Sequence, residues 1–282
     1  MNAVIMAGGF GTRMRPLTTS VPKPMVPVAG KPLMQHVVEL LARHAFVRQV
    51  GLLFYQPHII SDYFGDGSRF GVEMRYRRAE ADYGTAGSVK NAEDLLEDRI
   101  MIISGDVLTD IDLTEAIRFH EQKNAVATMV LVHAANPTEF GVVISDEGGR
   151  VKRFLEKPSW GDVISDTVNT GIYILEKEVI SDLEPREFVD FSQHVFPKLL
   201  ERDAPLCAYV SARYWRDVGN PEAYMDAHAD LWSGRVHLNL PGSPVAHGSA
   251  EFFASQTAEI SPDAELAGTV IVGEHARIEA GA

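Results

Sequence analysis

Short apolar runs alternate with stretches of helical periodicity through the first half of the chain. The apolar runs are rich in strand-forming residues and are expected to be strands: residues 2–6 (NAVIM), 49–55 (QVGLLFY), 72–77 (VEMRYR) and 99–104 (RIMIIS). Helical patterns fill the intervals, over residues 31–45, from His58 onward, and over 88–96. This βαβ rhythm predicts a doubly wound, mainly parallel, Rossmann-like sheet with helices on its faces.

The pattern changes after Val126, where strands follow one another without helices between them. The expected strands here are residues 126–133 (VATMVLVH), a hairpin over 140–156 (FGVVISDEGGRVKRFLE) and residues 170–175 (TGIYIL). Helical patterns return over 192–202 and 221–232. We therefore expect an α/β fold in which a hairpin insertion makes the sheet mixed, with residues 1–235 forming one large domain.

The last residues carry a different repeat. Ile260, Leu266, Val272 and Ile278 recur every six residues, which is typical of a hexapeptide β-helix, although an ordinary strand pair is the alternative. We expect residues 236–258 to be a linker and residues 259–282 to begin such a helix. Because so few repeats cannot bury a solenoid core, we expect the helix to be truncated here or completed by another subunit, which predicts a homo-oligomer.

Composition and charge narrow the class of protein. Of the 282 residues, 45% are hydrophobic, which is enough for one large core. The formal net charge of −13 argues against a general nucleic-acid surface, so basic residues near the N-terminus indicate a local site.

The apolar runs are too short to cross a bilayer and no leader-like segment precedes the first strand, so neither membrane attachment nor export is expected. The single cysteine, Cys207, fits a core position in a cytoplasmic protein.

A glycine-rich loop, AGGFGTRMRPLT, follows the first expected strand. It does not fit a dinucleotide fingerprint, because Met14 stands where the third glycine belongs, and no Gly-Lys-Ser/Thr follows as in a P-loop. The remaining interpretation is an anion site made of bare backbone N–H groups followed by two cations, and the alternative is a tight turn with surface arginines. The residues concerned are Gly8, Gly9, Gly11, Arg13 and Arg15.

Two aspartates and a lysine are candidates for handling phosphate charge. Asp106 ends an expected core strand, and ligands of open α/β sheets bind at the carboxyl ends of strands, where Asp106 and the glycine loop can converge. Asp217, in YWRDVG, precedes a glycine turn, and two such carboxylates suit Mg²⁺, which otherwise takes water and substrate phosphates as ligands. Lys23 stands between Pro22 and Pro24, which stiffen the segment. Taken singly, each residue also fits a turn or a solvated surface.

The sequence DID, residues 110–112, has the D-x-D form of metal-dependent glycosyltransferases. However, Asp112 precedes a helical run and has Glu115 three residues later, so a helix N-cap is the favoured interpretation. The histidines show no close metal-ligand spacing, and no zinc site is expected.

Two further segments have the chemistry needed for a sugar phosphate. FLEKP offers the carboxylate of Glu156 for hydroxyl groups and the ammonium of Lys157 for a phosphate, although adjacent strand residues point in opposite directions. VNTGIYIL offers Asn169 and Thr170 at the start of a strand, where turn chemistry is the alternative.

A set of motifs spread in order over about the first 225 residues is similar to that of the sugar-nucleotide pyrophosphorylases, a family of nucleotidyltransferases. The motifs are GGFGTRMRPLT, PKPMVPV, GTAGSVKNA, SGDVLTD, EFGVV, FLEKP, NTGIYIL and YWRDVG. Within the family they most resemble the mannose-1-phosphate guanylyltransferase branch, whose members add a left-handed β-helix. The resemblance implies a Mg²⁺-dependent reaction in which a sugar 1-phosphate attacks the α-phosphorus of a nucleoside triphosphate and expels pyrophosphate.

The resemblance also implies roles for individual residues. Arg13 would neutralise the departing pyrophosphate and Lys23 would hold the α-phosphate region, while Asp106 and Asp217 would bind the metal. The residues implied to bind the nucleotide are Ala7, Gly8, Gly9 and Gly84, and we expect their neighbours Gly11, Thr12, Asp82 and Thr85 to take part. Those implied to bind the sugar 1-phosphate are Gly141, Glu156, Lys157 and Asn169.

One departure bears on the choice of base. Many relatives carry Pro-Leu directly before the Gly-Thr-Ala-Gly motif, whereas Asp82 and Tyr83 precede Gly84 here. We expect GTP and mannose 1-phosphate as substrates, with UTP or dTTP and glucose 1-phosphate as the main alternative. A non-catalytic sugar-nucleotide sensor and a glycosyltransferase are the competing hypotheses of other classes.

Overall fold

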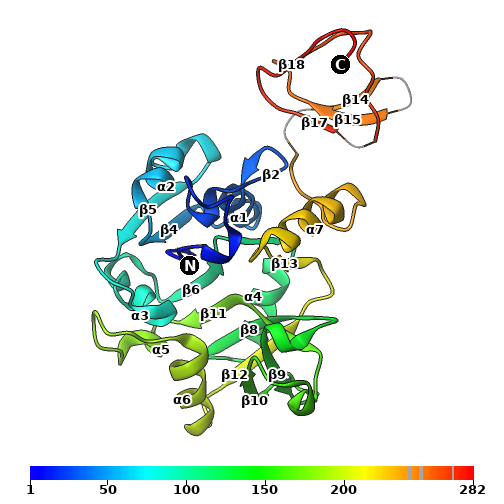
Figure 1. Cartoon of the computed structure of the whole chain (residues 1–282). Helices are drawn as coiled ribbons and strands as arrows, with labels where there is room; N and C mark the ends of the chain where they lie inside the picture. The colour runs from blue at the N-terminus through cyan, green and yellow to red at the C-terminus, as the bar shows by residue number, and fades with distance from the viewer. Residues whose placement is uncertain (241–242, 248–249, 269) are drawn as a thin grey trace.

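A nine-stranded sheet forms the centre of the computed structural model, which describes residues 1–240, 243–247, 250–268 and 270–282 (Figure 1). Its main path has the order β10-β9-β11-β6-β1-β4-β5, while β8 pairs with β11 and β12 with β8. The strands are β1 (Asn2–Ala7), β4 (Arg48–Leu53), β5 (Glu73–Arg78), β6 (Arg99–Ser104), β8 (Ala127–His133), β9 (Gly141–Ser145), β10 (Val151–Glu156), β11 (Thr167–Glu176) and β12 (Leu206–Val210).

The sheet has a parallel and an antiparallel part. β1 runs parallel to β4 and β6, and β4 to β5, whereas β11 runs antiparallel to β6, β8 and β9. The expected α/β fold with a mixed sheet is confirmed, but the sheet is not mainly parallel. β1, β4, β5 and β6 form parallel pairs and β12 runs parallel to β8, whereas the pairs that involve β9, β10 or β11 are antiparallel. The reason is the connections: parallel neighbours need long crossovers, whereas β9 and β10 are joined by a tight turn at Asp146–Gly149 and so run antiparallel.

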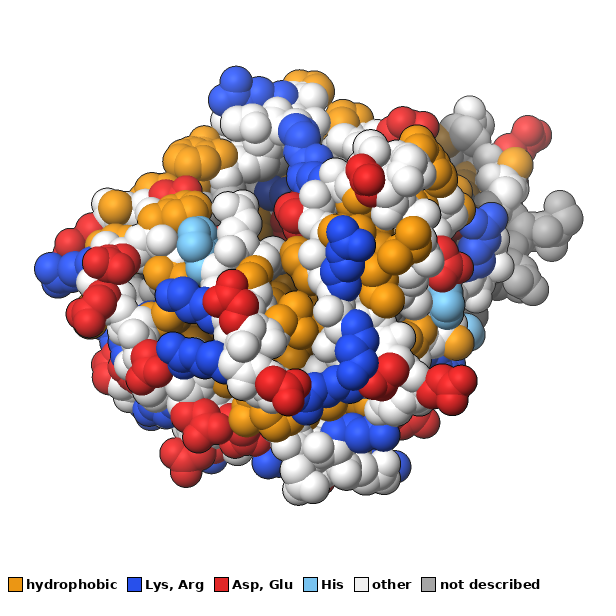
Figure 2. All heavy atoms as spheres, turned by 90° about the horizontal axis from the view of Figure 1, so that it is seen from below, with side chains coloured by type: hydrophobic (Ala, Val, Ile, Leu, Met, Phe, Trp, Pro, Cys, Tyr) orange, Lys and Arg blue, Asp and Glu red, His pale blue; other side chains and the backbone are white. Residues whose placement is uncertain are grey.

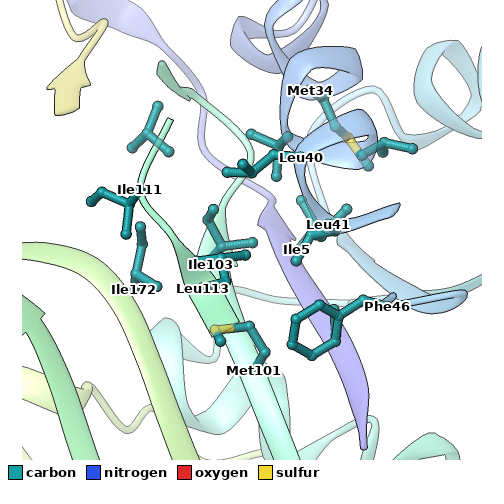
Figure 3. Close-up of a cluster of buried hydrophobic side chains, with 14 of the residues drawn as sticks. Ile5, Met34, Leu40, Leu41, Phe46, Met101, Ile103, Ile111, Leu113 and Ile172 are labelled. Atoms are coloured by element: carbon teal, nitrogen blue, oxygen red, sulfur yellow. The ribbon is translucent and has the colours of Figure 1, made fainter. Parts of the chain in front are cut away.

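Helices cover both faces of the sheet. One face carries α1 (Leu33–Arg43), α2 (Pro57–Phe64) and α4 (Leu113–Gln122), and the other carries α3 (Gly84–Lys90), α5 (Glu178–Ser181) and α6 (Phe196–Glu201). Ile5 and Ile103 pack with Leu41 in the core of the first face (Figure 3), while their neighbours Val4 and Ile102 belong to the core of the second. Strands buried on both faces need no polar alternation, which explains the continuous apolar runs in the sequence.

The helix expected over residues 88–96 differs from the one observed. Helix α3 begins at Gly84 and ends at Lys90, and a short 3₁₀ turn at Glu93–Leu95 follows. The earlier start depends on tertiary contacts, because the N–H groups of Ala86 and Gly87 donate to the carbonyl of Val189, far away in the sequence.

A third apolar cluster lies at the carboxyl edge of the sheet and supports the loops that follow the strands. Most of its buried residues come from the 3₁₀ turn η1 (Thr12–Met14), the strands β2 (Pro27–Val28) and β7 (Val107–Thr109), the helices α1 and α7 (Pro221–Trp232), and positions that directly follow the turn η2 (Lys23–Met25) and the strand β13 (Trp215–Asp217). The short strand β3 (Lys31–Pro32) pairs with β2. Buried Met14, Val26, Leu108 and Val218 pack together there. Because β13 pairs with β7, two segments over 100 residues apart are fixed side by side.

The C-terminal strands are β14 (Ser243–His247), β15 (Ala250–Ala254), β16 (Glu259–Ile260), β17 (Val270–Val272) and β18 (Arg277–Ile278), which lie apart from the main sheet (Figure 1). β14 and β15 fall within residues 236–258, the expected linker, where β14 pairs with β15, which in turn pairs with β17. The division into a linker and a repeat segment stays a prediction. The parallel pairs β15–β17 and β16–β18 join residues 18 positions apart (252 to 270, 260 to 278), which is the length of three hexapeptides. Ile260, Leu266, Val272 and Ile278 share one apolar cluster. The left-handed β-helix stays a prediction.

Within the described ranges, no helix has both the length and the apolar character needed to cross a membrane. On the face shown in Figure 2, lysine and arginine side chains lie among aspartate and glutamate side chains.

Candidate active site

The first cavity opens where the carboxyl ends of β1 and β6 meet. The two strands are parallel neighbours, and the N–H of Gly105 donates to the carbonyl of Met6 at 2.9 Å, which joins the loops that follow them. The cavity has a volume of about 390 Å³ and a largely apolar wall that includes Leu52 and Phe54. Six of the residues expected to bind nucleotide line it: Ala7, Gly8, Gly9, Asp82, Gly84 and Thr85.

Gly11 and Thr12 are placed differently from the other residues of the glycine loop. Gly11 has a φ of +63°, and a Cβ there would lie 2.8 Å from the Cβ of Lys23, so only glycine lets the loop pack against that lysine. The hydroxyl of Thr18 donates to the Gly11 carbonyl at 2.8 Å and holds the loop in place. Thr12 is exposed in η1 and, with Gly11, is not among the described residues that line the first cavity. The structure thus favours a supporting position for Gly11.

The opposite wall of the first cavity is the start of α3. Gly84 has a φ of +68°, and a Cβ there would lie 2.6 Å from the carbonyl oxygen of Val189, so glycine is required. Asp82 accepts a hydrogen bond from the Gly84 N–H at 2.9 Å through Oδ1. The Thr85 hydroxyl donates to Asp190 Oδ2 at 2.9 Å and accepts from the Phe191 N–H. The side chain of Thr85 therefore anchors the distant segment that completes the wall.

The second cavity, of about 280 Å³, adjoins the first. Eight of the expected site residues line it: Arg13, Lys23, Asp106, Gly141, Glu156, Lys157, Asn169 and Asp217. Ser104 and Asp106 line both cavities. The carboxyl end of β6 is therefore the point at which ligands in the two cavities would meet.

Two carboxylates and one ammonium group form the charged centre at this point. Lys23 Nζ lies 2.6 Å from Asp106 Oδ2 and 3.1 Å from Asp217 Oδ1. Lys23 is 7% exposed; burial by itself would lower its pKa, but the two carboxylates outweigh burial and raise the pKa above its ordinary value. Lys23 is therefore a protonated, buried cation that offsets one of the two negative charges of the pair.

The pairing of β7 with β13 explains why the two aspartates converge. Asp217 lies opposite Val107 in this ladder, and the N–H of Val218 donates to the carbonyl of Asp106 at 3.3 Å. Both aspartate side chains keep about 30% of their surface exposed, toward the second cavity. Among the described residues no group of three or more His, Cys, Asp or Glu forms a metal cluster. Two carboxylates facing one point beside open space nevertheless fit Mg²⁺, which commonly takes one or two protein carboxylates and completes its shell with water and phosphate.

The hairpin β9–β10 supplies one wall of the second cavity. Gly141 lies opposite Glu156 in the ladder, and a Cβ at Gly141 would lie 2.6 Å from the ring of Phe154 and 3.0 Å from Glu156 Oε2. Burial raises the pKa of Glu156, an effect that Lys157 opposes and Asp190 strengthens. Lys157 has a φ of +43°, so the chain leaves the strand there and both side chains face the cavity.

A bulge in β11 supplies the facing wall. The register shifts between Asn169 and Ile172, and the Asn169 side chain accepts from the Gly171 N–H at 3.1 Å while donating to the Tyr173 hydroxyl at 2.9 Å. Trp215 donates its indole N–H to the Thr170 carbonyl at 3.0 Å, which positions the ring on the same cavity. Asn169 is thus held in a fixed orientation by its own strand.

Several lining residues were missed by the sequence reasoning. Trp215 precedes Asp217 by two positions in one strand and therefore shares its face, so the sequence carried a usable signal for it. Phe188 and Asp190 reach the first cavity from a loop before the π-helical turn η7 (Phe191–Val195), and no local pattern marks them.

The DID sequence has a structural role. Asp112 Oδ1 accepts from the N–H groups of Thr114 and Glu115, so the expected helix cap is confirmed. Asp110 accepts from the N–H groups of Tyr214 and His237, both at 3.0 Å, and fixes the strand that leads to the second cavity. Both carboxylates are thus engaged by backbone, which removes the main support for a D-x-D glycosyltransferase.

The fold and the paired cavities agree with a single class of protein. The sequence model of the nucleotidyl transferase family matches residues 2–234, and the chain belongs to this family. The expected enzyme class, nucleotidyltransferase, is thereby confirmed.

Two related enzymes and one solved structure show which members of the family this chain is similar to. The chain is 38% identical over 284 residues to the mannose-1-phosphate guanylyltransferase of Mycobacterium tuberculosis, covering 100% of this chain and 77% of the relative. It is 34% identical over 296 residues to the UTP–glucose-1-phosphate uridylyltransferase of Synechocystis, covering 100% and 76%. Among solved structures, HddC from Yersinia pseudotuberculosis complexed with GMP-PN superposes with a TM-score of 0.70 at 27% identity, covering 82% of this chain and 99% of that chain.

Proposed function

We propose that this protein joins GTP and mannose 1-phosphate to give GDP-mannose and pyrophosphate, with Mg²⁺ as its metal. The observation that carries the proposal is the pair of adjoining cavities with Asp106 between them: the first is largely apolar and bounded by glycine backbone, and the second is lined by charged side chains. Such a division suits a nucleoside in the first cavity and a sugar phosphate in the second, with the triphosphate extending past Asp106 toward Arg13 and Lys23.

The reaction needs positioning and charge neutralisation rather than a protein nucleophile. A phosphate oxygen of mannose 1-phosphate attacks the α-phosphorus of GTP, the bond from that phosphorus to the oxygen bridging to the β-phosphate breaks, and pyrophosphate leaves with the bonding electrons. In this proposal the guanidinium of Arg13 stabilises the negative charge of the departing pyrophosphate, and the ammonium of Lys23 binds the α-phosphate. Holding both substrates in line supplies the remaining rate enhancement.

The metal would be held by Asp106 and Asp217, whose carboxylates face the junction of the cavities. When bound there, Mg²⁺ would offset negative charge on the phosphates. On the nucleotide side we assign the base and ribose to Ala7, Gly8, Gly9, Asp82 and Gly84, which line the first cavity.

On the sugar side, Glu156 and Asn169 would bind hydroxyl groups and Lys157 the phosphate, with Gly141 leaving the space that the sugar needs. The hydrogen bonds that Asn169 makes within β11 keep it aimed at the cavity before substrate arrives.

The choice of base and sugar rests on the relatives. Several relatives at 31–38% identity are named mannose-1-phosphate guanylyltransferases, which supports the GTP and mannose assignment. The Synechocystis uridylyltransferase, at 34% identity, supports the alternative of UTP or dTTP with glucose 1-phosphate. A non-catalytic sensor is disfavoured because the charged residues of both cavities are retained.

Pyrophosphate release tests the reaction class. We expect release only when a nucleoside triphosphate, a sugar 1-phosphate and Mg²⁺ are all present, and we expect Asp106→Asn to slow it by about a hundredfold or more. Binding of a nucleotide sugar without any pyrophosphate release would instead identify a sensor.

Two further expectations stay predictions: a homo-oligomer assembled through residues 259–282, and a cytoplasmic location. The mass in solution with and without the residues after 242 tests the first.

A further inference from the structure

The charged centre places a lysine ammonium where a divalent cation would bind. Lys23 Nζ contacts one oxygen of Asp106 at 2.6 Å and one oxygen of Asp217 at 3.1 Å. The position that faces both carboxylates, which the proposed function assigns to the metal, is therefore next to a positive charge of the protein itself.

The stem of Lys23 is held firmly, so this ammonium has a defined place. Pro22 and Pro24 restrict the backbone on both sides, and Lys23 begins the 3₁₀ turn η2. Gly11 packs against the Cβ of Lys23, so the base of the lysine side chain is held by the glycine loop as well. Only the outer part of the side chain is free to turn, and it would do so toward an anion in the second cavity, which Lys23 lines.

A metal ion bound to Asp106 and Asp217 would be repelled by the Lys23 ammonium, because both carry positive charge. A Mg²⁺ ion bound to carboxylate oxygens lies about 2.1 Å from them, so with Lys23 in the observed position the metal and the ammonium would be close neighbours in a partly buried, weakly screened place. The metal would also compete with Lys23 for the same oxygens. Conversely, if Lys23 turned away without a new partner, a buried ammonium would be left unpaired.

We propose that Lys23 couples metal binding to nucleotide binding. In the free enzyme it occupies Asp106 and Asp217 and keeps metal affinity low; when the nucleoside triphosphate enters, Lys23 transfers to the α-phosphate and releases both carboxylates to the metal. The inference rests on the proposed function and adds a second role to Lys23, that of a placeholder for the metal. Because coupling between ligands is reciprocal, bound metal strengthens nucleotide binding by the same factor.

The test measures Mn²⁺ binding to the free enzyme by electron paramagnetic resonance, without nucleotide, so that metal bound to nucleotide does not interfere. We expect Lys23→Met to bind Mn²⁺ about 5- to 150-fold more tightly than wild type, the range typical of coupling between sites. Lys157→Met is the matched control: it removes one positive charge from the same cavity, but Lys157 makes no recorded ion pair with either aspartate among the described residues, and its Mn²⁺ affinity should equal that of wild type.

A second measurement guards against misfolding, because Lys23→Met leaves two close carboxylates unpaired. We expect Mg²⁺ to raise the Tm of Lys23→Met, and of the polar variant Lys23→Gln, much more than that of wild type, since the metal replaces the missing charge. Adding Asp106→Asn to Lys23→Met should remove the gain in both assays.

Equal Mn²⁺ affinity in wild type and in folded Lys23→Met or Lys23→Gln would overturn the coupling while leaving the proposed reaction intact. If Lys23→Met keeps its tight Mn²⁺ binding after Asp106→Asn or Asp217→Asn is added, the metal assignment of the proposed function is wrong, and the coupling with it. The two failures are therefore distinguishable.

Discussion

The two cavities are built in different ways. The first is made by backbone at the carboxyl ends of parallel strands, with Gly8, Gly9 and Gly84 exposing main-chain atoms between apolar side chains. The second is made by side chains from antiparallel strands, with Glu156 and Lys157 facing Asp217. A backbone-lined cavity selects a ligand by its shape and width, whereas a side-chain-lined cavity selects by charge and hydroxyl pattern. Substitutions should therefore separate the two substrates.

The largest effect should come from the residues where the cavities meet. Replacing Asp106 or Asp217 by Asn removes a metal ligand and should lower kcat by about a hundredfold or more, because a main source of transition-state charge stabilisation is lost. The fold should survive, since each change keeps the size of the side chain. Turnover at limiting Mg²⁺ checks this; a variant that keeps the wild-type value there is not missing a metal ligand.

A methyl group in the first cavity should affect the nucleotide alone. In the part of the chain that the structure describes, a Cβ at Gly9 meets nothing within 4 Å, so Gly9→Ala should leave the Tm unchanged. It should still raise the KM for the nucleoside triphosphate about 10- to 100-fold if phosphate or ribose approaches this backbone, since one or more charged hydrogen bonds are lost.

The corresponding substitution in the second cavity is Gly141→Ala, whose Cβ would contact the Phe154 ring and Glu156 too closely. It should raise the KM for the sugar 1-phosphate and leave that for the nucleotide unchanged. Either glycine variant impairing both substrates equally would contradict the division of the site.

A smaller effect is expected at Glu156. Glu156→Gln should raise the KM for the sugar 1-phosphate about fivefold, the difference between a charged and a neutral hydrogen bond. Burial raises the pKa of Glu156, so its carboxylate protonates at a higher pH than an ordinary glutamate as the pH falls. The wild-type KM for the sugar phosphate should therefore rise toward acid pH while that of Glu156→Gln changes less; parallel pH profiles would show that Glu156 is not the titrating group.

The smallest effect on the reaction should come from Asp230, which binds Arg216 and Tyr214 on either side of the cavity residue Trp215. Its carboxylate is 3% exposed and accepts from Arg216 at 2.6 Å, Arg235 at 2.7 Å and the Tyr214 hydroxyl at 2.8 Å. Asp230→Asn should lower the free energy of unfolding by about 2 kcal/mol, less than for a fully buried pair because Arg235 is exposed and Arg216 is partly so, with kcat little changed.

The pH dependence of stability checks the assignment of Asp230. Burial by itself would raise the pKa of Asp230, but Tyr214 and the two arginines lower it below its ordinary 3.8. The stabilisation is thus present at neutral pH and is lost as the pH falls through the lowered pKa. The Tm values of wild type and Asp230→Asn should converge below about pH 4, whereas a constant difference would show that packing, not charge, is responsible.

The same contrast explains what could be predicted from the sequence. Gly8, Gly9 and Asp106 directly follow buried strands, so local pattern and the rule that ligands bind at strand ends were enough to group them. Asp190 was missed because it reaches the first cavity through a hydrogen bond with Thr85, 105 residues away, which no local pattern encodes.

The α/β class and the mixed sheet were predicted from local patterns, whereas the order of the strands was not. Which strands lie side by side depends on contacts between distant segments, as when β11 pairs with β6, and β15 with β17 further along the chain. The six-residue period of the tail was readable because it is local, and it reappears as the 18-residue offset between paired strands.

The most direct test of the central claim is kcat/KM for each nucleoside triphosphate with each sugar 1-phosphate, measured by pyrophosphate release. We expect the highest value for GTP with mannose 1-phosphate, because a base site penalises a base whose edge leaves its donors and acceptors unpaired. A higher value for UTP or dTTP with glucose 1-phosphate would contradict the assignment of substrates, and no pyrophosphate release with any pair would contradict the proposed reaction itself.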